Sequence, residues 1–237
     1  MIISLQSLPS DTDGIYQVNG HPHRLPARAL YLHPAAAAAF DSLESETGGL
    51  VYSDIFRSAE ASLVALQTKR GVQPPAYSAH NYGIAFDVAV DETMEKLKIS
   101  YAQLEVVLEK HGWFCHRRDK TRGFEDWHHN WLGPDPDKFL QYADLREPLS
   151  WSRPAEARIV ELYGTEFTMS LRDVQSALMK LRLYKGEVDG ILGPLTETAL
   201  HAFQRAWQIP EGPLNARTMR TLAYVACERL INPGRVA

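Results

Sequence analysis

Residues 78–87 read Ser78-Ala79-His80-Asn81-Tyr82-Gly83-Ile84-Ala85-Phe86-Asp87, and the chain continues with Val88-Ala89-Val90. The part from Ile84 onward alternates in side-chain size and is rich in residues that favour β structure, so it predicts a strand over 84–90. Because successive side chains of a strand point to opposite faces, Phe86, Val88 and Val90 would share one face. Asp87 would then lie on the other face, between two small alanines.

An imidazole and a carboxylate stand at the two ends of this segment, and both are good zinc ligands. His80 and Asp87 are separated by an odd interval, so they can converge only if the chain turns between them. Gly83 supplies a residue that tolerates such a turn. The alternative is that His80 is an ordinary turn residue and Asp87 an exposed strand residue.

A second segment, Gly123-Phe124-Glu125-Asp126-Trp127-His128-His129-Asn130-Trp131, supplies another imidazole three positions after a carboxylate. A catalytic zinc ion typically has three protein ligands and one open position, and it lowers the pKa of its water to roughly 7. His80, Asp87 and His128 would be the ligands, and Glu125 the general base. His129 is the competing ligand. We expect an exposed carboxylate at Asp126 and packing roles for Trp127 and Trp131.

The remaining pattern up to about residue 155 mixes helices and strands without a repeating βαβ order, which predicts an α+β domain over 1–155. Helices are expected from Pro34, over 58–69 and over 94–111, with a strand from Trp113. Two prolines and a loss of periodicity in 146–154 indicate an interdomain passage.

Beyond residue 168 the spacing of apolar residues is helical and predicts a bundle of three short helices, which we assign to a domain over 166–230. Thr196 and Asn215 are expected to cap the second and third of these helices.

The net charge of −4 argues against a protein that binds nucleic acid by neutralising phosphates. Two cysteines, Cys115 and Cys227, indicate buried thiols and not a disulfide framework. No run of about 18 apolar residues occurs, so membrane insertion is not expected. The first residues lack a basic and an apolar region of the Sec type.

Residues 78–87 and 123–131 resemble the VanY-type D-alanyl-D-alanine carboxypeptidases and VanX-type dipeptidases, relatives of phage L-alanyl-D-glutamate endopeptidases. The signature S-x-H-x-x-G-x-A-x-D is matched by Ser78, His80, Gly83, Ala85 and Asp87, and E-x-W-H by Glu125, Trp127 and His128. The resemblance implies one zinc ion on His80, Asp87 and His128, and Glu125 acting on water. It also implies an antiparallel sheet flanked by helices, as in the DD-peptidase/Hedgehog-like zinc fold.

Two further roles rest on the same resemblance. Phe56-Arg57-Ser58 is similar to an R-S element beside the substrate, so Arg57 would polarise the scissile carbonyl or neutralise a carboxylate. Ser78 would contact the substrate or a ligand. Arg57 as a surface or salt-bridged residue is the alternative.

The C-terminal region resembles the three-helix peptidoglycan-binding module, mainly through Val188-Asp189-Gly190-Ile191-Leu192-Gly193-Pro194. Together the resemblances predict a monomeric zinc peptidase that cuts a peptidoglycan stem peptide, with D-Ala-D-Ala carboxypeptidase chemistry favoured. Cleavage of L-Ala-D-Glu or of a cross-link, in a phage endolysin or a secreted effector, is the first alternative. A non-catalytic zinc protein that binds the wall is the second. Such an enzyme would reach the wall through lysis or a dedicated secretion machine.

Overall fold

The computed structural model of the protein describes residues 2–5, 8, 25, 29–68, 73–115, 120–123, 125–142, 152–163 and 169–231, without the side chains of 152 and 227–231. Contacts divide the chain into two compact units, Met1–Arg57 with Ala79–Gly164, and Ser58–Ser78 with Thr165–Ala237. The predicted domain limits at 155 and 166 stay a prediction. Most of the predicted interdomain passage, residues 146–151, lies outside the described residues.

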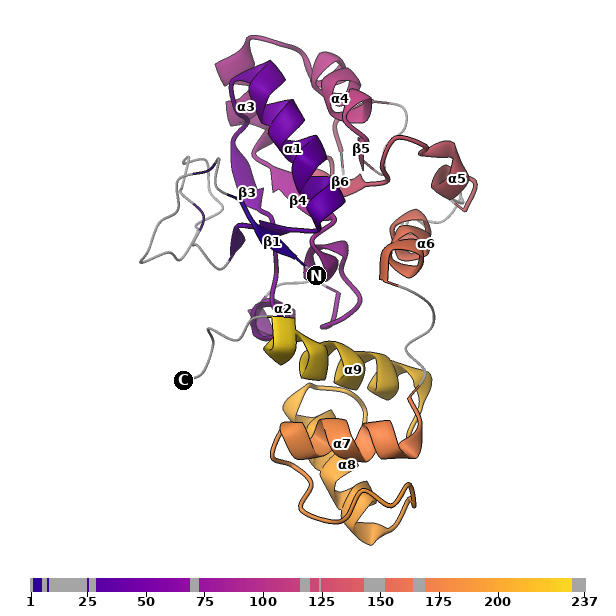
Figure 1. The fold of residues 1–237 in the computed structure, drawn as a ribbon. Coiled ribbons are helices and arrows are strands. Elements are labelled where there is room, and N and C mark those ends of the chain that lie inside the picture. Colours follow the sequence, from indigo (N-terminus) through magenta and orange to yellow (C-terminus); the bar gives the residue numbers. More distant parts are fainter. Residues whose placement is uncertain are drawn as a thin grey trace. The chain divides into compact units, whose positions relative to one another are not determined.

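The first unit is built on a four-stranded antiparallel sheet with the order β3-β4-β6-β5 (Figure 1). Its strands are β3 (Tyr52–Asp54), β4 (Ala85–Val88), β5 (Trp113–Cys115) and β6 (His128–Trp131). A second, two-stranded sheet pairs β1 (Ile3–Ser4) with β2 (Tyr31–Leu32). Antiparallel sheets flanked by helices confirm the predicted α+β class.

One face of the larger sheet is covered by α1 (Pro34–Thr47), which Figure 1 shows lying across the strands. Pro34 stands at the start of this helix, where its missing N–H is not needed, and Gly48 ends it with a φ of 71°. Phe40 of α1 packs on Tyr52 and Phe86, with ring centroids 5.0 and 6.0 Å apart. This face is therefore the apolar core, and the alternate side chains of β4 point away from it.

The expected single helix over 94–111 is wrong, because two helices occupy the region. They are α3 (Val90–Leu97) and α4 (Tyr101–Lys110). Lys98 ends α3 in the left-handed conformation, and Ser100 starts α4 with a capping box that includes Gln103. The strand also ends at Val88, earlier than predicted, and Val90 belongs to α3.

At the β5 edge of the sheet, α5 (Asp137–Leu140) and α6 (Ser152–Tyr163) carry a small apolar cluster. Leu132, Phe139 and Leu140 are its buried members, with Phe114 and Ala157 packed against them. The Tyr163 hydroxyl of α6 donates to the carbonyl of Tyr82 at 2.5 Å, which fixes the chain just before β4.

The second unit is helical and contains α2 (Ala59–Thr68), α7 (Leu171–Lys180), α8 (Pro194–Ala206) and α9 (Ala216–Ile231). The predicted cap of α9 is confirmed, since Asn215 Oδ1 accepts from the Thr218 amide at 3.0 Å. The predicted cap at Thr196 is wrong. Gly193 precedes α8 and Pro194 starts it, while the Thr196 side chain is buried inside the first turn.

Among the described helices, none is both long enough and apolar enough to cross a membrane.

Candidate metal centre

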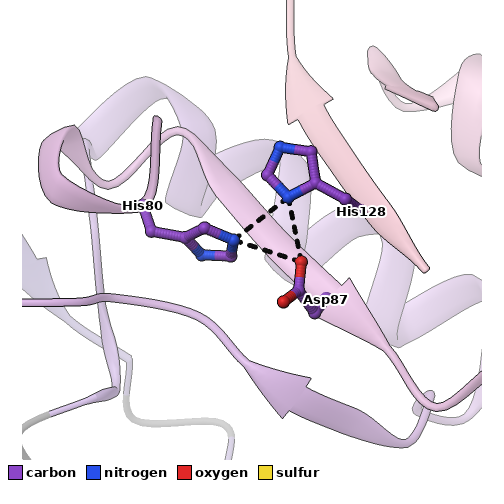
Figure 2. A group of neighbouring side chains, drawn as sticks. All are labelled: His80, Asp87 and His128. Atoms are coloured by element: carbon purple, nitrogen blue, oxygen red, sulfur yellow. Dashed lines mark hydrogen bonds and ion pairs between the residues drawn. The ribbon is translucent and has the colours of Figure 1, made fainter. Parts of the chain in front are cut away.

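Three side chains converge on the sheet face opposite α1. His80 lies in a short 3-10 turn, η2 (Ala79–Tyr82), which is followed by Gly83 with a φ of 65°. Asp87 on β4 and His128 on β6 are direct cross-strand partners. Because Phe86 and His129 also pair in register and face the core, Asp87 and His128 must both face the other way. The turn at Gly83 brings His80 back over them (Figure 2).

The candidate ligand atoms of these residues lie close together. His80 Nε2 is 3.1 Å from Asp87 Oδ1 and 3.1 Å from His128 Nδ1, and His128 Nδ1 is 2.9 Å from Asp87 Oδ1 (Figure 2). Atoms bonded at 2.0–2.1 Å to one tetrahedral zinc ion would be about 3.3 Å apart, so the observed spacing fits such an ion. His80 is buried, whereas Asp87 and His128 are partly exposed.

The outer nitrogens of both rings are held by acceptors. His80 Nδ1 lies 2.6 Å from the carbonyl oxygen of Ile55, and His128 Nε2 lies 3.1 Å from Asn130 Oδ1. A carbonyl oxygen can only accept, so these outer nitrogens carry the protons and the inner nitrogens offer lone pairs. Two lone pairs and a carboxylate oxygen at about 3 Å repel one another unless a proton or a metal ion lies between them. The three residues are therefore a candidate site for a metal ion.

Electrostatics at the cluster agree with this. Burial is the largest single effect on His80 and lowers its pKa, but attraction and a hydrogen bond to Asp87, together with attraction to Asp54, outweigh it, and the pKa of His80 is raised. Burial would raise the pKa of Asp87, but without a metal ion the positive charge that His80 can carry, and the hydrogen bonds that both imidazoles donate when protonated, hold it well below its ordinary value. Asp87 is therefore ionised and ready to ligate a metal.

Glu125 lies in the turn that leads into β6. It has a φ of 55°, and its carbonyl accepts from the His128 amide at 3.1 Å. This turn supplies the bend that the three-residue spacing of Glu125 and His128 requires. The Glu125 side chain is half-buried, and among the described residues its carboxylate has no hydrogen-bond or ion-pair partner. A half-buried carboxylate of this kind is able to accept a proton.

Arg57 lies beside the cluster and is paired. Its Nε and Nη2 donate to Asp54 Oδ2 at 3.0 and 2.5 Å, and its Nη2 is 4.0 Å from Asp87 Oδ2. The segment is tied to the 3-10 turn, because the Arg57 amide donates to His80 O and Asn81 Nδ2 donates to Arg57 O. Asp54 is buried, and its second oxygen Oδ1 has no hydrogen-bond partner in the described structure.

Ser78 is buried just before the turn, and its predicted role stays a prediction.

His129, the competing ligand, faces the core and does not join the cluster. Its Nε2 is 2.9 Å from Glu105 Oε1, and both side chains are buried. Two other expectations for this segment are wrong. Asp126 is buried, and its carboxylate accepts from Arg122 Nε at 2.5 Å and from the Gly123 amide at 3.0 Å. Trp127 is 42% exposed and is not packed in the core. Trp131 is buried, as predicted.

Sequence reasoning missed two residues that support the cluster, Asn130 and Asp54. Asn130 could have been found, since it follows His128 by two positions and must share its face on a strand. Asp54 precedes Arg57 by three positions and holds its guanidinium, but no pattern in the sequence connects this pair to the cluster. The Ile55 contact is made by a backbone carbonyl, which leaves no mark in the sequence.

The second unit is organised around the buried side chain of Gln175 on α7. Its Nε2 lies 2.7 Å from Asp189 Oδ1 and 3.0 Å from the carbonyl of Ile191, and its Oε1 accepts from the Gly190 amide at 2.7 Å. One side chain thus fixes the glycine-containing loop between α7 and α8. Residues 170–222 match the model of a putative peptidoglycan binding domain.

This match covers α7, α8 and the first part of α9, and it supports association of the chain with the cell wall. The hydrogen bonds of Gln175 lie within the matched residues, and they hold the loop between α7 and α8 of the peptidoglycan-binding domain. A comparison with curated proteins found no match for the chain.

Proposed function

We propose that the chain is a zinc-dependent peptidase that cleaves a stem peptide of peptidoglycan. The observation that carries the proposal is the meeting of two imidazole lone pairs and one carboxylate oxygen within 3.1 Å, each ring held from behind by an acceptor. Two imidazoles and a carboxylate suit zinc better than magnesium or calcium, which prefer oxygen ligands. Three protein ligands are also the number that catalytic zinc sites keep, with one position open.

Zinc bound there would supply Lewis acidity that activates water and polarises a carbonyl. Glu125 would accept the proton of the attacking water and pass it to the leaving amine. Glu125 precedes His128 by three residues, and the turn that holds the Glu125 backbone leads directly into this proposed ligand, which favours the role. Its carboxylate has no competing partner among the described residues.

Arg57 would act on the substrate and not on water. Asp54 holds its guanidinium through Nε and Nη2, and the group is 15% exposed. A held and partly exposed guanidinium can donate to a scissile carbonyl or to the terminal carboxylate of a stem peptide. The exposed indole of Trp127, on the same turn as Glu125, is a surface on which a peptide can pack.

The peptidoglycan-binding domain would hold the enzyme on its polymer. Binding through a second domain raises the effective concentration of the catalytic unit near stem peptides without new contacts at the active site. Carboxypeptidase cleavage of terminal D-Ala-D-Ala is the reaction we favour. Endopeptidase cleavage of L-Ala-D-Glu or of a cross-link uses the same chemistry.

Digestion of purified peptidoglycan tests the proposal. Wild type, Glu125→Ala and the control Glu109→Ala are compared by mass spectrometry of the muropeptides, together with zinc content per chain. Glu109 pairs with Lys120 in the same unit, so its loss removes a carboxylate remote from the cluster. We expect cleavage by wild type and Glu109→Ala, loss of activity of about a hundredfold or more in Glu125→Ala, and one zinc ion in each.

Loss of one terminal alanine would identify a carboxypeptidase, and release of internal fragments an endopeptidase. Unchanged muropeptides with a zinc-loaded wild type would refute the peptidase and leave a zinc protein that only binds the wall.

A further inference from the structure

The turn formed by residues 125–127 is held by its carbonyl groups. Each of its three consecutive carbonyl oxygens accepts a hydrogen bond from a different buried side chain. Cys115 Sγ lies 3.6 Å from Glu125 O, the Tyr101 hydroxyl 3.3 Å from Asp126 O, and His129 Nδ1 3.1 Å from Trp127 O. The three donors come from β5, α4 and β6, so separate elements of the unit converge on one short turn.

The directions of these hydrogen bonds follow from chemistry. Burial raises the pKa of the Tyr101 hydroxyl, so the phenol stays protonated, and its single proton can be donated to Asp126 O at 3.3 Å or to Cys115 Sγ at 3.7 Å. His129 Nδ1 faces a carbonyl oxygen and must carry a proton. Glu105 Oε1, 2.9 Å from His129 Nε2 on the opposite side of the ring, fixes the orientation of the imidazole.

The turn needs such support. Glu125 has a φ of 55°, a conformation that is unfavourable for a residue with a Cβ and persists only where its surroundings enforce it. A relaxed turn would move the Glu125 carboxylate relative to His128, the next residue but two. The four side chains around this turn are buried, so none of them can reach a substrate directly. They are Tyr101, Glu105, Cys115 and His129.

We propose that Tyr101, Cys115 and His129, with Glu105 behind His129, are positioning residues that hold Glu125 in the orientation in which it accepts a proton. This inference rests on the proposed peptidase function. We call these four residues the turn clamp. Glu105, Cys115 and His129 also form a group that could bind a second metal ion. A closed structural zinc site has four ligands, almost always cysteine and histidine, and the group has only one of each, so the clamp is the better account.

The test uses the full chain and soluble muropeptides prepared from the wall. Tyr101→Phe removes only the hydroxyl. Tyr52→Phe is the matched control, because Tyr52 is also buried in the first unit and its hydroxyl donates to Glu44 Oε1 at 2.6 Å and not to a carbonyl of the turn. We expect Tyr101→Phe to lower kcat about tenfold or more, since small misplacements of a catalytic group cost this much, with KM changed less than about twofold. Tyr52→Phe should lower the melting temperature similarly and leave kcat unchanged.

A second pair of variants covers the case in which Tyr101→Phe does not fold. The side-chain amide of Glu105→Gln keeps a hydrogen-bond partner for His129 Nε2, because its oxygen can accept from an N–H there and its NH2 can donate to a lone pair. This variant should keep most of the turnover, whereas Glu105→Leu should lose it. Hydrogen exchange of the peptide that covers 125–131 should be faster in Tyr101→Phe and Glu105→Leu than in wild type and Tyr52→Phe.

Each contrary result has its own meaning. A Tyr101→Phe protein with wild-type kcat and unchanged exchange at the turn overturns the clamp while the peptidase stands. Two zinc ions per chain in wild type and one in Glu105→Leu would show that the group binds a metal, which also overturns the clamp. A wild type without activity overturns the proposed function, and the clamp with it.

Discussion

Asn130 offers a sharp test of the metal centre, because it touches one ligand and is not a ligand itself. Its Oδ1 accepts from His128 Nε2 at 3.1 Å and so keeps the Nδ1 lone pair directed at the cluster. Asn130→Ala removes this partner and leaves all three ligands in place. Loss of such an outer partner weakens metal binding by about 10- to 100-fold, or about 1.4 to 2.7 kcal/mol.

The weaker affinity should appear as a smaller stabilisation by zinc. With zinc at about 100 times the wild-type Kd, binding stabilises wild type by about 2.7 kcal/mol. A 100-fold weaker site would be half-occupied and gain only about 0.4 kcal/mol. For a unit of this size the difference, about 2.3 kcal/mol, corresponds to about 5 to 9 °C in melting temperature.

The assay is a pair of thermal melts, with zinc and with a chelator, and a competition titration with a chromophoric chelator. Thr93→Val is the control, since Thr93 is buried in the same unit and accepts from the Val51 amide at 3.0 Å away from the cluster. It should lower both melting temperatures and leave the zinc-induced difference unchanged. Equal zinc-induced shifts in wild type and Asn130→Ala would refute the assignment of His128 Nδ1 as a ligand.

Three further predictions follow from the two units. Gln175→Leu should destabilise the second unit by about 3 kcal/mol and reduce cosedimentation with insoluble peptidoglycan, whereas the exposed Met179→Leu on the same helix should do neither. Without zinc, ionised Asp87 stabilises the fold above a pH of about 4, and this stabilisation is lost as the pH falls through its lowered pKa. Protonated His80 stabilises the fold below a pH of about 6.5, and this stabilisation is lost as the pH rises through its raised pKa. Denaturant melts in chelator should therefore show a maximum between these limits, and zinc should shift it upward because protons compete with the metal. Gly83→Ala should cost more than about 1 kcal/mol in thermal melts and weaken zinc binding, since its Cβ would lie 2.7 Å from the backbone nitrogen of His33 at a φ of 65°.

Local patterns in the sequence predicted most of the elements. Period-two alternation predicted a strand over 84–90, found at 85–88, and the proline signal predicted the start of the helix at Pro34. The long helix predicted over 94–111 was split because capping at Ser100 competes with apolar spacing, and the spacing continues across the break. Apolar periodicity alone does not register such a local stop.

The sequence by itself determined the types of residues at the candidate centre: two imidazoles, a carboxylate between them in chain order, and a second carboxylate three residues before the last imidazole. Spacing on a strand required a turn between His80 and Asp87, which Gly83 permits, and a bend or bulge between Glu125 and His128. Only the tertiary structure decided between His128 and His129, because adjacent residues differ in nothing but the face they occupy, and that face is set by pairing with Asp87. It also decided which groups stand behind the site, since Ile55 O and the turn clamp are brought together by packing between elements far apart in the chain.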